Sequence, residues 1–390
     1  MNLIDYATER QAEIIKAYEE HGSHRKAAKA LGIGKSRVAE VLQVVSKRAA
    51  MSGYAPESSM TKTVPAPYIV KGVSTLYDKN GNVAAQWVKS QIDKDQAFQA
   101  IKEWIESLSK DIKGASRLVE VPKTSNTDLL AVYPIGDPHF GMFAWAEETG
   151  DDFDLKIAER LAMGAIDHLV SSAPDADTAI ILELGDFFHA DSNDARTPRS
   201  GNSLDTDTRW AKVMQVGLRS MIYTIQAAMK KHTNVIVRIV KGNHDPHSSF
   251  ALALSLHAFF SNNPRVKVDL SPSPFWYYNF GNVLIGSTHG DGIKAQQLPL
   301  IMAADQHYLW GATKHRFFHC GHIHHDDKKE FPGCIVEYHR TLASRDAWHT
   351  AAGYRSGRDM KCIIYHKKYG ERIRYTCNVD MIEDQDGNSA

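Results

Sequence analysis

The sequence predicts an α/β protein, a layered α/β sandwich preceded by an all-α domain and a small α+β adapter. From Leu129 onward, β-branched strand-like runs alternate with helical stretches, which is typical of parallel pairing. Residues 8–50 instead carry apolar side chains at helical spacing. The chain has 390 residues, 43% of them hydrophobic, which is enough for two or three domains and a large core.

Residues 1–50 are predicted to form a domain of three short helices. Ser23 is placed to cap the second helix, and Gly32 and Gly34 separate it from the third. This pattern is typical of a helix-turn-helix.

Charge favours DNA as the partner of this first domain. The chain as a whole has a formal net charge of zero, but residues 21–50 contain seven Lys or Arg and one acid, Glu40. A basic surface on a neutral protein suits contact with a phosphate backbone. The alternative is a helical bundle that binds another protein. The predicted DNA-binding residues are Arg25, Lys26, Lys35, Ser36, Arg37 and Lys47.

Residues 51–67 are rich in Pro, Ser and Thr and are predicted to be a linker. Residues 68–127 are predicted to form an adapter, with a hairpin over Val70–Lys89 that turns at residues 78–81 and a helix that begins after Asp93. The α/β domain is expected to span 128–380, and 381–390 to be a disordered tail.

The α/β domain is predicted from its alternating elements. Three strands are expected at Leu129–Ile135, Thr178–Leu184 and Asn234–Val240, with helices at Leu155–Ser172 and Trp210–Lys231 between them. Strand–helix–strand alternation gathers functional groups at the carboxyl ends of the strands. Further strands are expected within Trp276–Gly286, Phe317–Cys320, Cys334–Thr341 and Lys361–Tyr375.

Five short segments rich in His and Asp follow apolar runs in a fixed order. They are Gly-Asp-Pro-His, Gly-Asp-Phe-Phe-His, Gly-Asn-His-Asp, Thr-His-Gly-Asp and Gly-His-Ile-His. Two divalent cations need such a mixture of carboxylate, amide oxygen and imidazole ligands. Any one histidine could be a hydrogen-bonded core residue, but the ordered set predicts a metal site. The candidates are Asp137, His139, Asp186, His189, Asn243, His244, His289, His322 and His324.

Other histidines lie outside these segments. His257, His307, His349 and His366 are expected to be ordinary structural residues, and His325 to lie on the rim of the site.

The order D-x-H, G-D-x-x-H, G-N-H-D, H-G, G-H-x-H resembles the calcineurin-like metallophosphoesterase superfamily over about residues 128–375. The resemblance implies the layered α/β/β/α metallophosphoesterase sandwich and a centre of two metal ions that activates a water for attack on phosphorus. It also implies that His244 contacts the phosphate or acts as general acid. The implied ligands are Asp137, His139 and His324 for the first ion, Asn243, His289 and His322 for the second, and Asp186 as a bridge.

His189 indicates a branch of that superfamily. In phosphoprotein phosphatases the second motif is followed by Asp and Arg, whereas this chain has Phe-Phe-His, which resembles the DNA-repair nucleases of the SbcD-like branch. The resemblance implies that His189 orients or assists His244. Only 66 residues follow His324, too few for the capping and ATPase-docking segments of that branch, so no ATPase partner is expected.

The loop Ala190–Asp207 carries Arg196 and Arg199 and could line a substrate groove, with both arginines on phosphates. The alternative is an ordinary solvated loop.

The leading interpretation is a metal-dependent phosphodiesterase that cleaves DNA, with Mn²⁺ as the expected metal and Fe²⁺, Zn²⁺ or Ni²⁺ also compatible with the ligands. The alternatives are a phosphatase or small-molecule phosphodiesterase, and an inactive core in a DNA-binding regulator. The four cysteines form no C-x-x-C pair and the first residues do not resemble a signal peptide, so a cytoplasmic protein with no membrane partner is expected. The oligomeric state is left open, although helix-turn-helix proteins and repair nucleases are often homodimers.

Overall fold

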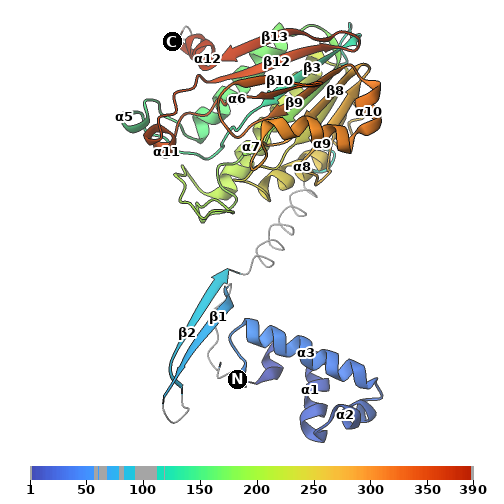
Figure 1. The fold of residues 1–390 in the computed structure, drawn as a ribbon, viewed down its shortest axis with the longest axis vertical. Coiled ribbons are helices and arrows are strands. Elements are labelled where there is room, and N and C mark those ends of the chain that lie inside the picture. Colours follow the sequence, from blue (N-terminus) through green and yellow to red (C-terminus); the bar gives the residue numbers. More distant parts are fainter. Residues whose placement is uncertain are drawn as a thin grey trace. The chain divides into compact units, whose positions relative to one another are not determined.

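The computed structural model describes residues 2–56, 60, 68–78, 83–92, 112–117 and 119–387. The chain divides into two compact units, Met1–Ile101 and Lys102–Ala390 (Figure 1). None of the helices in these described parts is both long and apolar enough to cross a membrane.

The first unit contains the three helices where the apolar spacing predicts them. After a short 3-10 helix, η1 (Leu3–Tyr6), come α1 (Glu9–His21), α2 (His24–Leu31) and α3 (Lys35–Met51). The Ser23 side chain accepts a hydrogen bond from the Lys26 backbone N–H, as expected of a helix cap. The three helices enclose a small core of Ile14, Ile15, Ala17, Ala27, Ala28, Val38, Val41 and Val45.

The first unit also holds the predicted hairpin. Strands β1 (Tyr68–Tyr77) and β2 (Val83–Ile92) pair antiparallel. Most of the helix predicted after Asp93 lies outside the described residues.

The second unit is built on two sheets. The six-stranded sheet has the order β13-β12-β3-β4-β5-β6, and the five-stranded sheet has the order β10-β11-β9-β8-β7. The first comprises β3 (Asn126–Ile135), β4 (Ala176–Glu183), β5 (Asn234–Ile239), β6 (Val266–Val268), β12 (Asp359–His366) and β13 (Gly370–Asn378). The second comprises β7 (Trp276–Phe280), β8 (Val283–Ser287), β9 (His315–Cys320), β10 (Asp327–Phe331) and β11 (Cys334–Tyr338).

The two sheets pack face to face with helices on both outer faces. Apolar residues of β3, β4 and β12 meet those of β7, β8 and β9 in one buried cluster. Helices α6 (Leu155–Ser172) and α7 (Trp210–Lys231) cover the six-stranded sheet, with α8 (Ser248–Phe259) beside α7. On the other side, Leu298 and Met302 of α9 (Leu298–Asp305) pack on the five-stranded sheet, and α10 (His307–Ala312) follows. This is the α/β/β/α sandwich that the sequence predicts.

The structure differs from two of the predicted boundaries. Part of the segment 112–127, assigned to the adapter, belongs to the second unit, since the Gly114 N–H bonds to the carbonyl of Ala258 and β3 begins at Asn126. Most of the expected disordered tail is also ordered, because α12 (Val379–Gly387) is a helix with Ile382 buried. A methyl group on Gly164 would collide with Ile382, so the helix lies close against α6. Residues 388–390 lie outside the described part.

A histidine network lies buried inside the sandwich. His319 on β9 contacts His339 through Nδ1 at 2.9 Å and the Tyr365 hydroxyl through Nε2 at 2.9 Å. Glu337, beside them, accepts two hydrogen bonds from Arg374. Burial lowers the pKa of His319 to about 4. The His319 and His339 rings therefore serve as uncharged hydrogen-bonding groups.

This network predicts a loss of stability in mild acid. His319 takes up a proton below pH 6.5 in the unfolded chain but only near pH 4 in the folded one, so stability is full above pH 6.5 and falls as the pH drops toward 4. Between pH 7.5 and pH 5, protonation linked to His319 is expected to lower the free energy of unfolding by about 2 kcal/mol. Urea unfolding of His319→Gln should show a weaker pH dependence than wild type, and the exposed His257→Gln serves as the control. Equal pH dependence in His319→Gln and wild type would contradict this assignment.

Candidate metal centre

The carboxyl ends of five strands bring the predicted ligands together. Asp137 follows β3, Asp186 follows β4 and Asn243 follows β5, and these strands are parallel and in register. His289 follows β8, and His322 follows β9 in the second sheet. Both sheets therefore supply one site.

The candidate ligands form two groups of converging donor atoms. Asp137, His139 and His324 offer atoms within 4.8 Å of one another, and so do Asp186, His289 and His322. The Nε2 atoms of His139 and His324 are 3.1 Å apart. Asn243 joins the second group, with its Oδ1 3.0 Å from Nε2 of His289. The resemblance implies Asp186 as a bridge between two ions, whereas its carboxylate groups here with His289 and His322.

The protonation of these donors shows what a cation would replace. Nδ1 of His289 donates to the Leu184 carbonyl at 2.8 Å, and Nε2 faces Oδ1 of Asn243 and Oδ2 of Asp186. Burial opposes its charge, but the Asp186 carboxylate holds the pKa of His289 well above its usual range, so Nε2 carries a proton that a bound cation would displace. Burial and the neighbouring imidazoles hold the pKa of His139 well below its usual range, so this ring is neutral. Neutral imidazoles and carboxylates are the form in which these residues bind metal.

Asp186 is ionised in this environment. Burial alone would raise its pKa, but the charge and hydrogen bond of His289 outweigh burial and hold the pKa of Asp186 well below its usual range. The two carboxylate oxygens are used differently. Oδ1 accepts the His244 backbone N–H at 2.8 Å, and Oδ2 lies 3.2 Å from Nε2 of His289.

The backbone turns sharply at the ligands. Five of the six described non-glycine residues with a left-handed backbone are candidate ligands, with φ between 45° and 73°. They are Asp137, His139, Asp186, His322 and His324. A left-handed residue reverses the chain within a short distance, so a ligand at that position leaves the strand end and points into the site.

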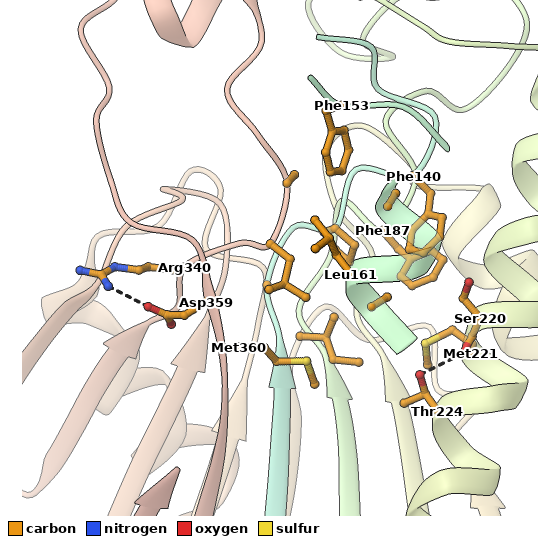
Figure 2. Close-up of a pocket in the computed structure, with 17 residues that line it drawn as sticks. Phe140, Phe153, Leu161, Phe187, Ser220, Met221, Thr224, Arg340, Asp359 and Met360 are labelled. Atoms are coloured by element: carbon orange, nitrogen blue, oxygen red, sulfur yellow. Dashed lines mark hydrogen bonds and ion pairs between the residues drawn. The ribbon is translucent and has the colours of Figure 1, made fainter. Parts of the chain in front are cut away.

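The first two ligand loops are joined to each other by their backbones. The His139 N–H donates to the Asp186 carbonyl at 3.1 Å, and the Phe140 N–H to the Phe187 carbonyl at 2.8 Å. The rings of Phe140 and Phe187 stack at 4.8 Å. With Phe153 they line an apolar pocket behind the loops (Figure 2). Asp137 and His139 are therefore fixed relative to Asp186 before any ion binds.

Gly242 leaves space for Asp186. A Cβ atom on Gly242 would lie 2.0 Å from Oδ1 of Asp186 and 2.1 Å from its backbone nitrogen. Its own N–H donates to the buried carboxylate of Asp245 at 3.0 Å, which also accepts the Phe188 N–H. The Asp186 and Asn243 loops are thus packed together with no room for a side chain.

Gly242→Ala is expected to lower Mn²⁺ affinity at least about 10-fold, because Asp186 must move away from the added methyl group. Isothermal titration calorimetry with Mn²⁺ measures the change. Gly311→Ala in α10, where a Cβ meets nothing within 4 Å, is the matched control. Unchanged metal binding in Gly242→Ala would show that this close approach does not position Asp186.

His244 and His189 lie beside the ligands. Nδ1 of His244 donates to the His189 carbonyl at 2.9 Å, so its Nε2 is free to act, and that atom is 4.0 Å from Oδ2 of Asp186. The two rings stack with centroids 5.4 Å apart. Burial lowers the pKa of His189 to about 3, which keeps this ring neutral. His189 thus holds His244 through its backbone carbonyl, while Nδ1 of its own ring lies 3.2 Å from Nδ1 of the candidate ligand His139.

The sequence interpretation missed three further residues that lie beside the site. The Thr341 hydroxyl donates to the Asp137 carbonyl at 2.6 Å. The ring of His349, expected to be purely structural, stacks on His324 with centroids 4.8 Å apart. Asp346 holds His349 through Nδ1 and its backbone N–H, both at 2.7 Å. The spacing of Asp346 and His349, a helix cap followed by its third residue, is the one signal in the sequence.

The two candidate arginines of the 190–207 loop differ. Arg199 is 80% exposed and 3.7 Å from Asp291, two residues after His289, so it lies near the site. Arg196 is exposed and donates to the Gly201 carbonyl within its own loop. Among the described residues, Arg196 forms no hydrogen bond or ion pair with a candidate ligand.

The predicted DNA-binding residues are exposed on the helices of the first unit. Lys35, Ser36 and Arg37 lie in the first turn of α3, and Arg37 pairs with Glu40 at 2.9 Å. Arg25 and Lys26 are exposed on α2, and Lys47 on α3.

Comparisons with known proteins give weak matches. No family model matches the chain, and no curated protein does. Among solved structures, a novel archaeal phosphodiesterase is 15% identical to this chain, with a TM-score of 0.31. The match covers 63% of this chain and 99% of the phosphodiesterase. A predicted phosphoesterase from Streptococcus pneumoniae has 10% identity and a TM-score of 0.27, and the match covers 64% of this chain and 98% of that protein. Zinc-bound Vps29 from Entamoeba histolytica has 12% identity and a TM-score of 0.26, with the same two coverages of 64% and 98%. Similarity at this level does not by itself establish a fold or an activity.

Proposed function

We propose that the chain is a metallophosphoesterase that hydrolyses phosphodiester bonds of DNA with two divalent metal ions, Mn²⁺ being the preferred candidate. The observation that carries the proposal is the pair of converging donor groups, one around Asp137 and one around Asp186, at the ends of adjacent strands. Two cations so held would clamp the attacking and leaving oxygens of a phosphoryl group and activate a water.

The protein's own groups supply the remaining chemistry. Asp137 and Asp186 bring negative charge into the site. This charge attracts cations, and without them it would repel the anionic substrate. His244, with Nδ1 fixed on the His189 carbonyl, presents Nε2 to the site and would give a proton to the leaving oxygen. Arg199, near the rim, would contact a neighbouring phosphate.

DNA is supported as the substrate by the first unit. Exposed lysines and arginines on α2 and α3 suit a phosphate backbone, and a DNA-binding module on a phosphodiesterase chain is most simply explained by a nucleic-acid substrate. A small phosphoester or phosphoprotein is the alternative substrate.

The test is turnover by the purified chain with Mn²⁺. Single-stranded DNA, double-stranded DNA, an aryl phosphodiester and an aryl phosphomonoester are compared, with Asp186→Ala as the inactive control. We expect both the DNA and the aryl phosphodiester to be cleaved. Preference for the monoester with no DNA cleavage would identify a phosphatase instead.

The helices of the first unit are expected to raise activity on DNA specifically. In Lys35→Ala/Arg37→Ala, the ratio of DNA turnover to aryl phosphodiester turnover at low DNA concentration should fall about 10-fold or more, because a lost base contact costs roughly 1–3 kcal/mol and a lost phosphate contact weakens binding further. Lys16→Ala, exposed on α1, is the control. An unchanged ratio would argue that these helices bind something other than the substrate.

A further inference from the structure

A chain of aromatic rings leads from a candidate metal ligand to the protein surface. His349 stacks on His324 at 4.8 Å with an angle of 22° between the rings. Trp348 meets His349 edge to face at 4.9 Å, and Tyr354 meets it at 5.2 Å. Trp348 and Tyr354 themselves lie 5.9 Å apart. We call Trp348 and Tyr354 the aromatic platform.

The platform is held by the same segment that borders the metal centre. Asp346 caps α11 (Ala347–Ala351), which carries Trp348, and binds His349. Upstream, Arg345 donates to the Thr149 carbonyl at the end of α5 (Ala146–Thr149), which lies beside α11 (Figure 1). Tyr354 and His324 line one small pocket. The platform is therefore set in place relative to His324.

Packing does not account for Trp348. Its side chain is 64% exposed, although an indole buried in a core contributes far more apolar burial than one left in water. Tyr354 is 37% exposed, and the aromatic residues Phe143 and Trp145, just before α5, are also exposed. Exposed aromatic faces that adjoin a binding site offer a surface for a planar ligand.

One exposed cation lies beside the platform. Arg355, the neighbour of Tyr354, is exposed, whereas Arg345 at the start of the same segment pairs with Asp151 and donates to the Thr149 carbonyl. A cation near stacked rings binds a phosphate of a single strand while its bases lie on the aromatic faces. In a duplex both faces of each base are already stacked, so only an unpaired base could use this surface.

We propose that Trp348 and Tyr354 stack an unpaired nucleobase next to the phosphodiester bond to be cleaved, so that the preferred substrate is single-stranded or frayed DNA. This inference rests on the proposed function, which places the phosphate at the metal centre. Trp348 is then a specificity-determining residue, since it recognises a flat base of any sequence and not the phosphate itself.

The test compares two single-stranded tetranucleotides, one intact and one lacking its central bases. Such strands are too short to offer a duplex groove to the helices of the first unit. KM for hydrolysis is measured with the Mn²⁺-loaded full chain. Binding is measured separately by fluorescence anisotropy, using the same strands with phosphorothioate linkages that slow hydrolysis. The variants are Trp348→Ala, Trp348→Phe and, as a control, Tyr308→Ala, whose ring is 78% exposed on α10.

For wild type we expect the intact strand to bind about 10-fold more tightly than the base-free strand, since the intact strand alone can stack a base on Trp348. Trp348→Ala should remove this preference, Trp348→Phe should keep most of it, and Tyr308→Ala should not change it. The inference is overturned if wild type shows no preference. It is also overturned if Trp348→Ala lowers the affinity for both strands equally, as expected if Trp348 has a structural or protein-binding role. If the preference is present but neither strand is hydrolysed, the proposed function fails and the stacking surface stands.

Discussion

Replacing Asp186 with alanine is expected to reduce Mn²⁺-dependent hydrolysis of an aryl phosphodiester at least about 1,000-fold, because loss of a metal ligand removes several kcal/mol of transition-state stabilisation. The effect should be the largest of any single substitution here. Asp186 is buried and ionised, it belongs to one donor group, and its backbone carbonyl accepts the N–H of His139 in the other.

Two quantities are measured, the metal content of the purified protein and its rate of hydrolysis. Metal content after gel filtration with Mn²⁺ should fall in both Asp186→Ala and Asp186→Asn, since the amide has the shape of the carboxylate without its charge. Asp305→Ala in α9 controls for loss of an acidic residue elsewhere. Wild-type turnover in Asp186→Ala would show that the site has been assigned wrongly.

Replacing His244 with alanine should slow DNA cleavage by about 100- to 10,000-fold while leaving metal content unchanged, the usual range for loss of a general acid. The cleaved DNA oxygen is an alkoxide that needs a proton, whereas an aryl leaving group departs readily without one. The rate on the aryl phosphodiester should therefore fall by less than about 10-fold in the same variant.

The difference between the two substrates separates general-acid catalysis from structural damage. His257→Ala, an exposed histidine on α8, is the control and should match wild type on both. An equal loss on DNA and aryl ester would mean that His244 positions the phosphate or the loop and does not donate the proton.

The sandwich and the gathering of ligands could be predicted because both follow from local pattern. Alternating strands and helices imply parallel pairing, and parallel strands in register bring Asp137, Asp186 and Asn243 to one edge. The family resemblance then implied a division of the ligands between two ions, and the structure brings Asp137, His139 and His324 together, and likewise Asp186, His289 and His322.

The rest depended on contacts that sequence does not encode locally. His349 lacks a motif of its own and reaches the site only because α11 folds back onto His324. Residues 381–390 were expected to be a disordered tail, but Ile382 is buried against Gly164 of α6. Strand β6 is three residues long and carries too little pattern to be recognised.

The left-handed residues at the candidate metal centre set a minimum size for the domain. A non-glycine residue in this region costs on the order of 1 kcal/mol, so five of them together cost about 5 kcal/mol. That sum equals the entire stability of many small domains. The burial of a large two-sheet core offsets this free-energy cost, whereas a minimal fold carrying the same five ligand positions would unfold. Transplanting these loops to a smaller scaffold should therefore fail for reasons of stability before the question of catalysis arises.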